Sequence, residues 1–468
     1  MPVRRRAGVW CGQLIASRFN DLCDWLQRLP LHSATATAPA EVLFVWWQAE
    51  YSDFARFNHG RLRQAGTVTR ICIDLRLIVA RRSAKLRLTV SGDASQDQAA
   101  MQTALVNLRA AIASAVDDPY LLINREPASS HRIQSATLAT PEQAIATVVD
   151  AALGHDLVGA YMAGPIAVAL WSNLGHRHYF EGSSWSFDFS IYARSDADHD
   201  RRDKAVKATV AAQDWQPDQV RLAINRAALD CEILYRPVKV LTPGSYRALL
   251  APAALAAMVD MLNWGGFSAR SHLTGQSPLM QLKEGKLAFN TKLSLAEDLL
   301  DAAAPAFQAD GFVRANRTGL IDNGRFGQWL CSPRTGSEFN IGNNGSGPDE
   351  QPSALLMASG DLPFNQQLAA LDQGIAISNL WYLNFSDRQH CRITGMTRFA
   401  TFWVEDGVAV APIAPMRFDD SLYQCLGAQL LALGDQTQWL PNLSSYEWRE
   451  FGGQRVPSAL IAALRFTL

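Results

Sequence analysis

The sequence predicts an α+β fold, in which an N-terminal α+β region spans residues 1–236 and a mainly β C-terminal domain spans residues 237–468. In the first half, segments that alternate apolar and polar residues, as half-buried strands do, are interspersed with segments of helical spacing. The second half is mostly strand-like and rich in loops. A stretch punctuated by prolines, residues 237–250, separates the two parts.

Strand patterns occur in two groups within the first half. Residues 42–48 form a compact apolar and aromatic run, and residues 67–80 and 85–90 alternate, so that these three segments predict a meander. Residues 158–194 are rich in Val, Tyr, Trp and Phe, and the alternation over residues 184–192 predicts a pair of strands.

Helix patterns lie between these groups. Residues 99–115 carry apolar side chains at helical spacing and end at a proline-containing stop, which predicts a helix. Residues 127–141 are polar and predict a connection, after which Thr140 caps a second helix over residues 141–153. The N-terminal region is therefore either one unit or two subdomains that divide near residues 127–155.

Four further elements are predicted around the domain boundary. Residues 196–203 form a charged turn, and residues 204–212 and 217–229 have the patterns of two short helices. Residues 252–262 have the pattern of an Ala-rich helix that stops at a Gly-Gly pair, because glycine commonly ends helices.

Composition excludes several classes of protein. A chain of 468 residues is too long for one ordinary core, and 48% hydrophobic with 19% charged residues is typical of a globular protein. The 43 Lys and Arg residues balance 44 Asp and Glu residues, so no net field attracts a polyanion. We therefore expect no nucleic-acid partner.

The cysteines and the N-terminal segment indicate the cellular compartment of the protein. Seven scattered cysteines without a Cys-x-x-Cys pair indicate a reducing compartment, and they favour neither disulfides nor a zinc knuckle. The basic start leads into an apolar stretch, residues 7–16, that is short and broken by Gly12 and Gln13, so we do not interpret it as a signal peptide. No segment has the roughly 20 apolar residues of a membrane span. We expect a cytoplasmic protein.

Familiar catalytic spacings are absent from the sequence. It contains no Gly-x-Ser-x-Gly, Ser-x-x-Lys, phosphate-binding Gly-x-x-x-x-Gly-Lys or His-Glu-x-x-His motif. His176 and His178 alone have ligand-like spacing, because residues two apart on a strand share a face. They could hold a metal with a third ligand. We prefer the alternative of two exposed histidines that flank Arg177 near a turn.

His390 and Cys391 are neighbours and would point to opposite faces of a strand, so they cannot share one ion. Cys391 is either a ligand or thiolate or, as we prefer, a small buried hydrophobe. Asp419 and Asp420 are interpreted as caps of a helix that begins at Ser421.

Three aromatic residues could form a ligand platform. These are Trp185, Trp381 and Tyr382. We assign them to the core, because large aromatic side chains contribute most of their stabilisation when they are buried.

One C-terminal block resembles a known family. Residues 391–407 read Cys-Arg-Ile-Thr-Gly-Met-Thr-Arg-Phe-Ala-Thr-Phe-Trp-Val-Glu-Asp-Gly, and Ala-Pro at 411–412 and Met-Arg-Phe at 416–418 follow. This block is similar to the C-terminal block of the TldD/PmbA metallopeptidases, with its Thr-Gly, its basic-aromatic stretch and its strand ending in Val-Glu-Asn/Asp-Gly. Residues 54–60 and 235–252 resemble two further family segments, in the same order.

The resemblance implies a fold and an assembly. It implies an N-terminal α+β region, a mainly β C-terminal domain and a TldD–TldE heterodimer that encloses a proteolytic chamber for unfolded peptides. In that family TldD binds zinc through His-Glu-x-x-x-His, on a helix just after a strand of the third domain, and a later cysteine is a further ligand.

This chain departs from the family at that helix. Residues 257–272 contain neither a histidine pair nor a glutamate, so they can neither hold the ion nor activate its water. Residues 267–277 resemble the corresponding TldE segment instead. The resemblance therefore implies a noncatalytic, TldE-like subunit with no catalytic residue and no cofactor of its own, whose TldD-like partner carries the zinc. His272 is the one residue of this segment that could still be a zinc ligand.

Three hypotheses follow for function. In the first, the chain pairs with a TldD-like zinc subunit, or with itself, and grips peptide along a strand edge. Its candidate peptide- or partner-facing residues are Arg392, Thr394, Thr397 and Arg398, which could equally belong to a structural turn with solvated arginines. In the second, a standalone metal-dependent peptidase uses a nonstandard site drawn from His176, His178, His272, His390 or Cys391. The third is a nonproteolytic binding or scaffold protein.

Overall fold

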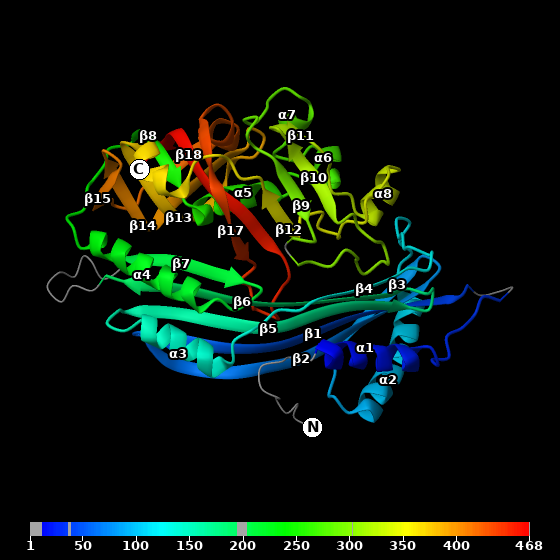
Figure 1. Ribbon diagram of the computed structural model, residues 1–468. Helices are drawn as coiled ribbons and strands as arrows, with labels where there is room; N and C mark the ends of the chain where they lie inside the picture. Colours follow the sequence, from blue (N-terminus) through cyan, green and yellow to red (C-terminus); the bar gives the residue numbers. More distant parts are fainter. Residues whose placement is uncertain (1–11, 36–38, 194–203, 302, 468) are drawn as a thin grey trace.

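The computed structural model describes residues 12–35, 39–193, 204–301 and 303–467 (Figure 1). The basic start at residues 1–11 and the predicted charged turn at 196–203 lie outside these residues. In Figure 1 the long strands of an N-terminal sheet form a lower layer, and the C-terminal strands form a second layer above it. The predicted α+β class with a mainly β C-terminal part is confirmed.

The N-terminal sheet has seven strands in the order β3-β2-β1-β5-β6-β4, with β7 paired to β6. All its pairings are antiparallel except the parallel pair β4–β6. The bounds are β1 Glu41–Asn58, β2 Arg61–Val79, β3 Arg82–Thr89, β4 Ser129–Gln134, β5 Leu157–Ser172, β6 Arg177–Tyr192 and β7 Ala205–Ala212. The predicted meander and strand pair are present as β1–β3 and β5–β6.

Four helices accompany this sheet, and α1, α2 and α3 lie on its lower side in Figure 1. Their bounds are α1 Gly12–Leu26, α2 Ala94–Ser114, α3 Pro141–Ala151 and α4 Pro217–Leu234. Thr140 caps α3 as predicted, because its hydroxyl accepts the Gln143 N–H while the Gln143 side chain accepts the Thr140 N–H. Helix α3 therefore begins and ends close to its predicted bounds, whereas α2 ends close to its predicted end but begins earlier than residue 99, at Ala94 after the Asp93 cap.

Two local predictions in the first half were wrong. Residues 205–212 form strand β7, where a helix was predicted over residues 204–212, because their backbone pairs with β6 from Trp185 to Tyr192, on the side that β5 leaves free. The polar connection at 127–141 contains strand β4, which pairs with the same side of β6 as β7 does, over the earlier segment Arg177 to Gly182. In both places tertiary pairing overrides the local preference.

The C-terminal sheet has eleven strands, in the order β11-β10-β9-β12-β18-β16-β14-β13-β8 with β15 and β17 attached. Strand β18 pairs with both β16 and β8, so β8, β13, β14, β16 and β18 form a closed ring of pairings. The bounds are β8 Gly244–Leu250, β9 Leu295–Asp298, β10 Arg317–Asp322, β11 Arg325–Phe326, β12 Ala354–Met357, β13 Gly374–Asp387, β14 Arg392–Glu405, β15 Val408–Pro412, β16 Arg417–Ser421, β17 Leu430–Pro441 and β18 Gly453–Phe466.

Short helices connect these strands, and one longer helix, α5, packs against β13 and β18 in the largest apolar core of the molecule. The bounds are α5 Pro252–Asn263, α6 Ala269–Leu273, α7 Met280–Lys283, α8 Pro333–Phe339, α9 Gln367–Leu371, a 3-10 turn Phe364–Gln366 and a π turn Gln424–Ala428. Helix α5 matches the Ala-rich helix predicted from the sequence. Among the helices of the described residues, none is long and apolar enough to span a bilayer.

The loop between β17 and β18, residues 442–452, joins the two layers. The Arg449 guanidinium donates hydrogen bonds to the Gly164 carbonyl at 3.0 Å and to the Ser52 and Ser184 hydroxyls at 3.2 and 3.0 Å. Phe451 packs on Phe180 of β6, with ring centroids 4.8 Å apart. The C-terminal part is thereby fixed on the upper face of the N-terminal sheet.

Candidate functional site

Helix α5 occupies the position, just after strand β8, where the sequence comparison expects a zinc-binding helix. Most of its side chains are buried in the core, and its half-buried polar residues are Asp260 and Asn263. Asp260 Oδ1 accepts hydrogen bonds from Asn263 Nδ2 and from Gln454 Nε2 of β18, both at 3.0 Å. The helix therefore presents a carboxylate held by two amides.

This polar cluster does not fit a zinc ion. Zinc in proteins is held mainly by imidazole and thiolate ligands, and the cluster offers only oxygen and amide groups. Burial raises the pKa of Asp260, which disfavours the charged form that a metal requires. The buried Asn263 Oδ1 and Gln454 Oε1 atoms have no hydrogen-bond partner within the described part of the chain. Neither an imidazole nor a general-base glutamate stands on this helix.

His272 serves the fold of the segment that follows α5. Its Nε2 lies 2.8 Å from the Gly266 carbonyl and 3.1 Å from the Ser277 hydroxyl, and the side chain is buried. Burial is the main cause of its lowered pKa, so the ring is neutral at neutral pH. Through these contacts His272 links Gly266 to Ser277, so its role in this segment is structural.

The prediction that His176 and His178 are exposed was wrong. Both side chains are fully buried at the junction of the two layers, where Phe307 stacks on His178 with centroids 5.1 Å apart. Each Nδ1 is hydrogen-bonded to a serine hydroxyl, at 2.6 Å for His176 and 2.8 Å for His178, and each Nε2 is unpartnered among the described residues. His176 lies just before β6 rather than on it, yet its ring stacks against that of His178 with centroids 6.2 Å apart, and Phe307 and Gly311 lie against the two rings.

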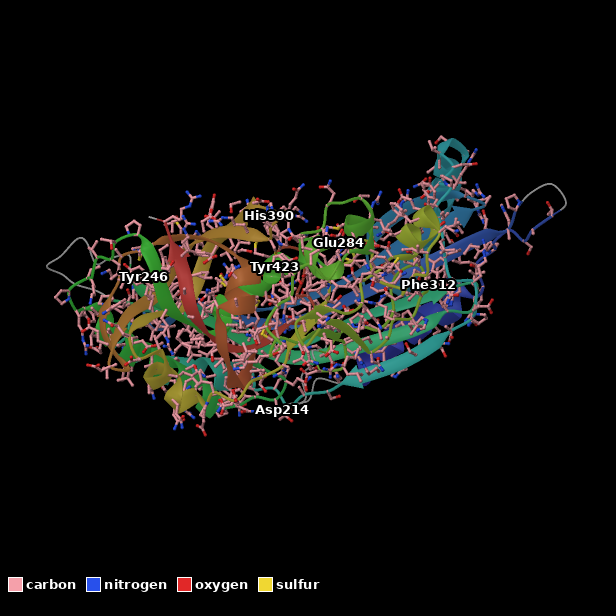
Figure 2. The ribbon with its side chains drawn as sticks, turned by 90° about the horizontal axis from the view of Figure 1, so that it is seen from above. Asp214, Tyr246, Glu284, Phe312, His390 and Tyr423 are labelled. Atoms are coloured by element: carbon pink, nitrogen blue, oxygen red, sulfur yellow. The ribbon has the colours of Figure 1, made fainter. Side chains whose placement is uncertain are left out.

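His390 and Cys391 separate as their adjacency predicts. His390 is exposed, and its Nδ1 lies 2.7 Å from Asp387 Oδ2. Figure 2 shows His390 near the outer margin of the molecule and the buried Tyr423 further in. Cys391 is fully buried, and burial raises the pKa of its thiol to about 12, so it is a small apolar side chain rather than a thiolate.

The five candidate metal ligands therefore do not converge. Within residues 12–35, 39–193, 204–301 and 303–467, no three His, Cys, Asp or Glu side chains are grouped closely enough to hold a metal ion. A mononuclear protein zinc site needs at least three such donors. The geometry of the described donors does not favour a nonstandard peptidase site.

The four candidates on β14 fall into two environments. Arg392 pairs with the Asp419 carboxylate of β16, and the Thr394 hydroxyl donates to the Phe418 carbonyl at 3.0 Å. Asp419 is thus a strand residue that binds an arginine, and the prediction that it caps a helix was wrong. Both interactions hold β14 to its neighbouring strand and leave little of Arg392 or Thr394 free for a ligand.

Thr397 is buried, which contradicts its assignment to a surface. It is 3% exposed, and its hydroxyl accepts the Met416 N–H at 3.0 Å. Arg398 alone of the four lies on an open face, where its guanidinium carbon stands 4.0 Å from the ring centroid of Trp381. A cation–π contact of this kind fixes the arginine over the indole.

Arg398 belongs to a surface that the sequence did not reveal. Trp381, Tyr382 and Met396 are 48%, 80% and 40% exposed, although we assigned the first two to the core. Together with Arg398 they form what we call the β13–β14 patch. The other core assignment, Trp185, is confirmed, because this side chain is fully buried.

Two irregularities in the strand ladder create the β13–β14 patch. Tyr382 and Phe399 both have φ of 60°, and the β13–β14 register shifts beside each of them. A bulge re-aims the side chains next to it, and here Trp381 faces Met396 across the ladder while the Tyr382 ring lies 6.3 Å from that of Trp381. Alternation cannot reveal such a surface, because the bulges break the alternation.

A family profile and three solved structures resemble this chain. The profile of the PmbA/TldA metallopeptidase C-terminal domain matches residues 243–468. TldE from Thermococcus kodakarensis has a TM-score of 0.77 and 14% identity over 92% of this chain and 97% of that chain. A search of curated proteins finds no match.

The other two structures are described as candidate modulators of DNA gyrase. The protein from Thermotoga maritima has a TM-score of 0.70 over 97% of this chain and 100% of its own, at 14% identity. The protein from Bacteroides thetaiotaomicron has a TM-score of 0.74 over 97% and 99%, also at 14% identity. At this level of identity the three structures show a likeness of fold alone, over both layers of the molecule.

Proposed function

We propose that this chain, whose residues 243–468 match the profile of the PmbA/TldA metallopeptidase C-terminal domain, is a TldE-like, noncatalytic subunit of a cytoplasmic zinc metallopeptidase complex. The complex degrades or processes unfolded peptides, and a TldD-like partner supplies the zinc. The observation that carries this proposal is the composition of α5, which holds Asp260 and Asn263 where a peptidase needs two imidazoles and a glutamate.

The β13–β14 patch supports the assembly with a partner. Interfaces are enriched in exposed Trp, Tyr, Met and Arg, and single residues of these types commonly carry much of the binding energy. The patch gathers all four types on one ribbon, and Arg398 is already held over Trp381. We assign the TldD-like subunit as its occupant, and peptide is held elsewhere through backbone hydrogen bonds along a strand edge.

Activity measurements test the noncatalytic role. The purified chain is incubated with casein or an unfolded peptide, with and without added zinc, and then together with a TldD-like subunit that carries His-Glu-x-x-x-His. We expect no cleavage by the chain alone and zinc-dependent cleavage by the pair. Metal-dependent turnover by the isolated chain, with one tightly bound zinc per molecule by elemental analysis, would refute the proposal and favour the standalone peptidase.

Pull-down from co-expressing cells tests the partner surface. Trp381→Ala and Arg398→Ala should each weaken the complex by about ten-fold or more, because they remove interface anchors. Tyr446→Ala is the matched control, since Tyr446 is 96% exposed in the loop at residues 442–452 and outside the patch. Equal recovery of the partner by all three variants would show that the patch is not the interface.

A further inference from the structure

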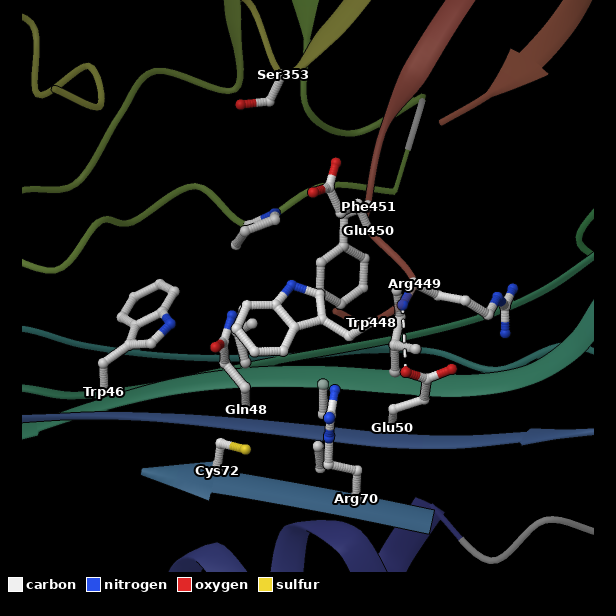
Figure 3. Close-up of a pocket in the computed structure, with 15 residues that line it drawn as sticks. Trp46, Gln48, Glu50, Arg70, Cys72, Ser353, Trp448, Arg449, Glu450 and Phe451 are labelled. Carbon is white, nitrogen blue, oxygen red and sulfur yellow. Dashed lines mark hydrogen bonds between the residues drawn. The ribbon is translucent and has the colours of Figure 1, made fainter. Parts of the chain in front are cut away.

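A cavity of about 210 Å³ lies between the N-terminal sheet and the loop at residues 442–452 (Figure 3). Its floor is the upper face of β1, β2 and β5, where Trp46, Gln48 and Glu50 alternate with buried residues of β1. Its roof is Trp448 and Phe451 of the loop. An engineered protein cavity of about 150 Å³ accepts benzene, so this cavity has room for one aromatic ring with a small substituent.

The roof of the cavity is anchored on both sides. Arg449 binds three residues of the sheet through its guanidinium, and Arg70 of β2 donates a hydrogen bond to the Glu447 carbonyl. Arg87 covers one face of the Trp448 indole at 4.8 Å. The loop is thus held on the sheet by hydrogen bonds and a cation–π contact of its own, which keep Trp448 and Phe451 above the cavity.

The chemistry of the cavity is set by a buried carboxylate. Glu50 is 8% exposed, and the single hydrogen bond that its carboxylate accepts from the described residues comes from the Arg449 N–H at 3.2 Å. Arg70 lies directly opposite Glu50 in the strand register, yet its guanidinium is turned to the Glu447 carbonyl. A buried carboxylate with so little hydrogen bonding gains free energy from a cationic partner.

Aromatic and amide groups surround this carboxylate. In Figure 3 the Gln48 side chain rises between the indoles of Trp46 and Trp448, and the Arg449 side chain points away from them. The Gln48 amide makes no hydrogen bond to any described residue. Indole faces attract cations as well as apolar surface, so the walls suit a charged group on an apolar stem.

We propose that this cavity binds an organic cation, an amidinium, guanidinium or ammonium group carried on an aromatic or short apolar stem. Glu50 pairs with the charge, Gln48 accepts a further hydrogen bond, and Trp46 and Trp448 cover the stem. Two arginines lie nearby: Arg70 is exposed with its guanidinium turned to the Glu447 carbonyl, and the charge of Arg449 interacts with Glu50. The Arg449 guanidinium is held by the Gly164 carbonyl and points away from the two indoles, so a bound cation would share the Glu50 carboxylate with it from the side of the indoles. This site is independent of the peptidase assembly proposed above.

Titration calorimetry on the full chain tests the charge preference. Benzamidine is compared with neutral benzamide and with benzoate, which have the same ring and nearly the same size. We expect one saturable site for benzamidine and affinities at least ten-fold weaker for the other two ligands. Equal affinities for benzamidine and benzamide, or no saturable binding of benzamidine, would overturn the proposal.

Variants locate the site. Glu50→Gln should weaken benzamidine binding by about ten-fold or more while leaving benzamide unchanged, because the amide keeps the shape and loses the charge. Glu232→Gln is the matched control, because Glu232 is an exposed carboxylate on α4. If Glu50→Gln does not fold, Trp46→Leu provides the second variant, with the same expected loss. Unchanged benzamidine binding in a folded Glu50 or Trp46 variant would exclude this cavity.

A small free cation and the basic side chain of a peptide would both present a positive charge on an apolar stem to this cavity. A second titration distinguishes these two sources of ligand. A tripeptide with capped ends and a central arginine is compared with the same peptide containing citrulline, the neutral isostere. Arginine peptide binding that is at least ten-fold tighter than citrulline binding, and that competes with benzamidine, identifies a peptide side chain as the ligand. Binding of benzamidine alone identifies a small free cation.

Discussion

Acidification should loosen the junction between the two layers through His176 and His178. Both imidazoles are fully buried, and their unpartnered Nε2 atoms would each have to carry a proton in an apolar setting of Phe44 and Phe307. Burial is the main cause that lowers both pKa values, and it lowers that of His178 from 6.5 to about 4. The two imidazoles therefore take up protons at a lower pH in the native state than in the unfolded chain.

The sign and size of the effect follow from linkage. Between pH 6.5 and about 4 the unfolded chain binds more protons at this site, so the free energy of unfolding falls as the pH falls through this window. A shift of this size corresponds to about 3 kcal/mol for His178, and His176 adds to it in the same direction. The stability that comes from keeping these imidazoles neutral in the native state is fully present above pH 6.5 and is lost near pH 4.

Urea unfolding between pH 7.5 and 4.5 measures this dependence. His178→Phe keeps a ring against Phe307 and removes the titrating group, so its unfolding free energy should fall less steeply with acid than that of the native chain. Comparison with the variant also removes the effects of buried carboxyl groups such as Glu181, whose pKa burial raises and which act in the opposite direction. His390→Gln, at an exposed position, serves as the control. Parallel curves for His178→Phe and the native chain would refute the reasoning.

Three further outcomes are expected for stability. Gly311→Ala should destabilise the fold by about 1–3 kcal/mol in urea unfolding, because Gly311 has φ of 85° and a Cβ there would lie 2.8 Å from His176 Nε2. Thr140→Ala should cost about 1 kcal/mol in the same assay through loss of the helix cap, whereas Thr140→Ser should cost much less. Arg449→Leu should accelerate proteolytic cleavage within residues 442–452, and equal cleavage rates would show that its hydrogen bonds do not hold the loop.

The sequence determined the features whose causes are local. The Thr140 cap, the helical spacing of α2 and the alternation over residues 184–192 of β6 each depend on residues close in the chain, so they were predicted correctly. The absence of zinc ligands on α5 is also local, because two imidazoles on one helix face must lie within a few residues. These local features predict the fold class, and the missing zinc ligands are the basis of the noncatalytic interpretation.

Tertiary structure alone decided which side chains are buried and which meet. Phe307 lies against His178 and Gly311 against His176, and strand pairing with β6 turned residues 205–212 into β7. Backbone bulges at Tyr382 and Phe399 turned expected core aromatics outward beside Arg398. The cavity at Glu50 needs a loop almost 400 positions later in the chain, and no periodicity within one segment records a contact between segments so far apart.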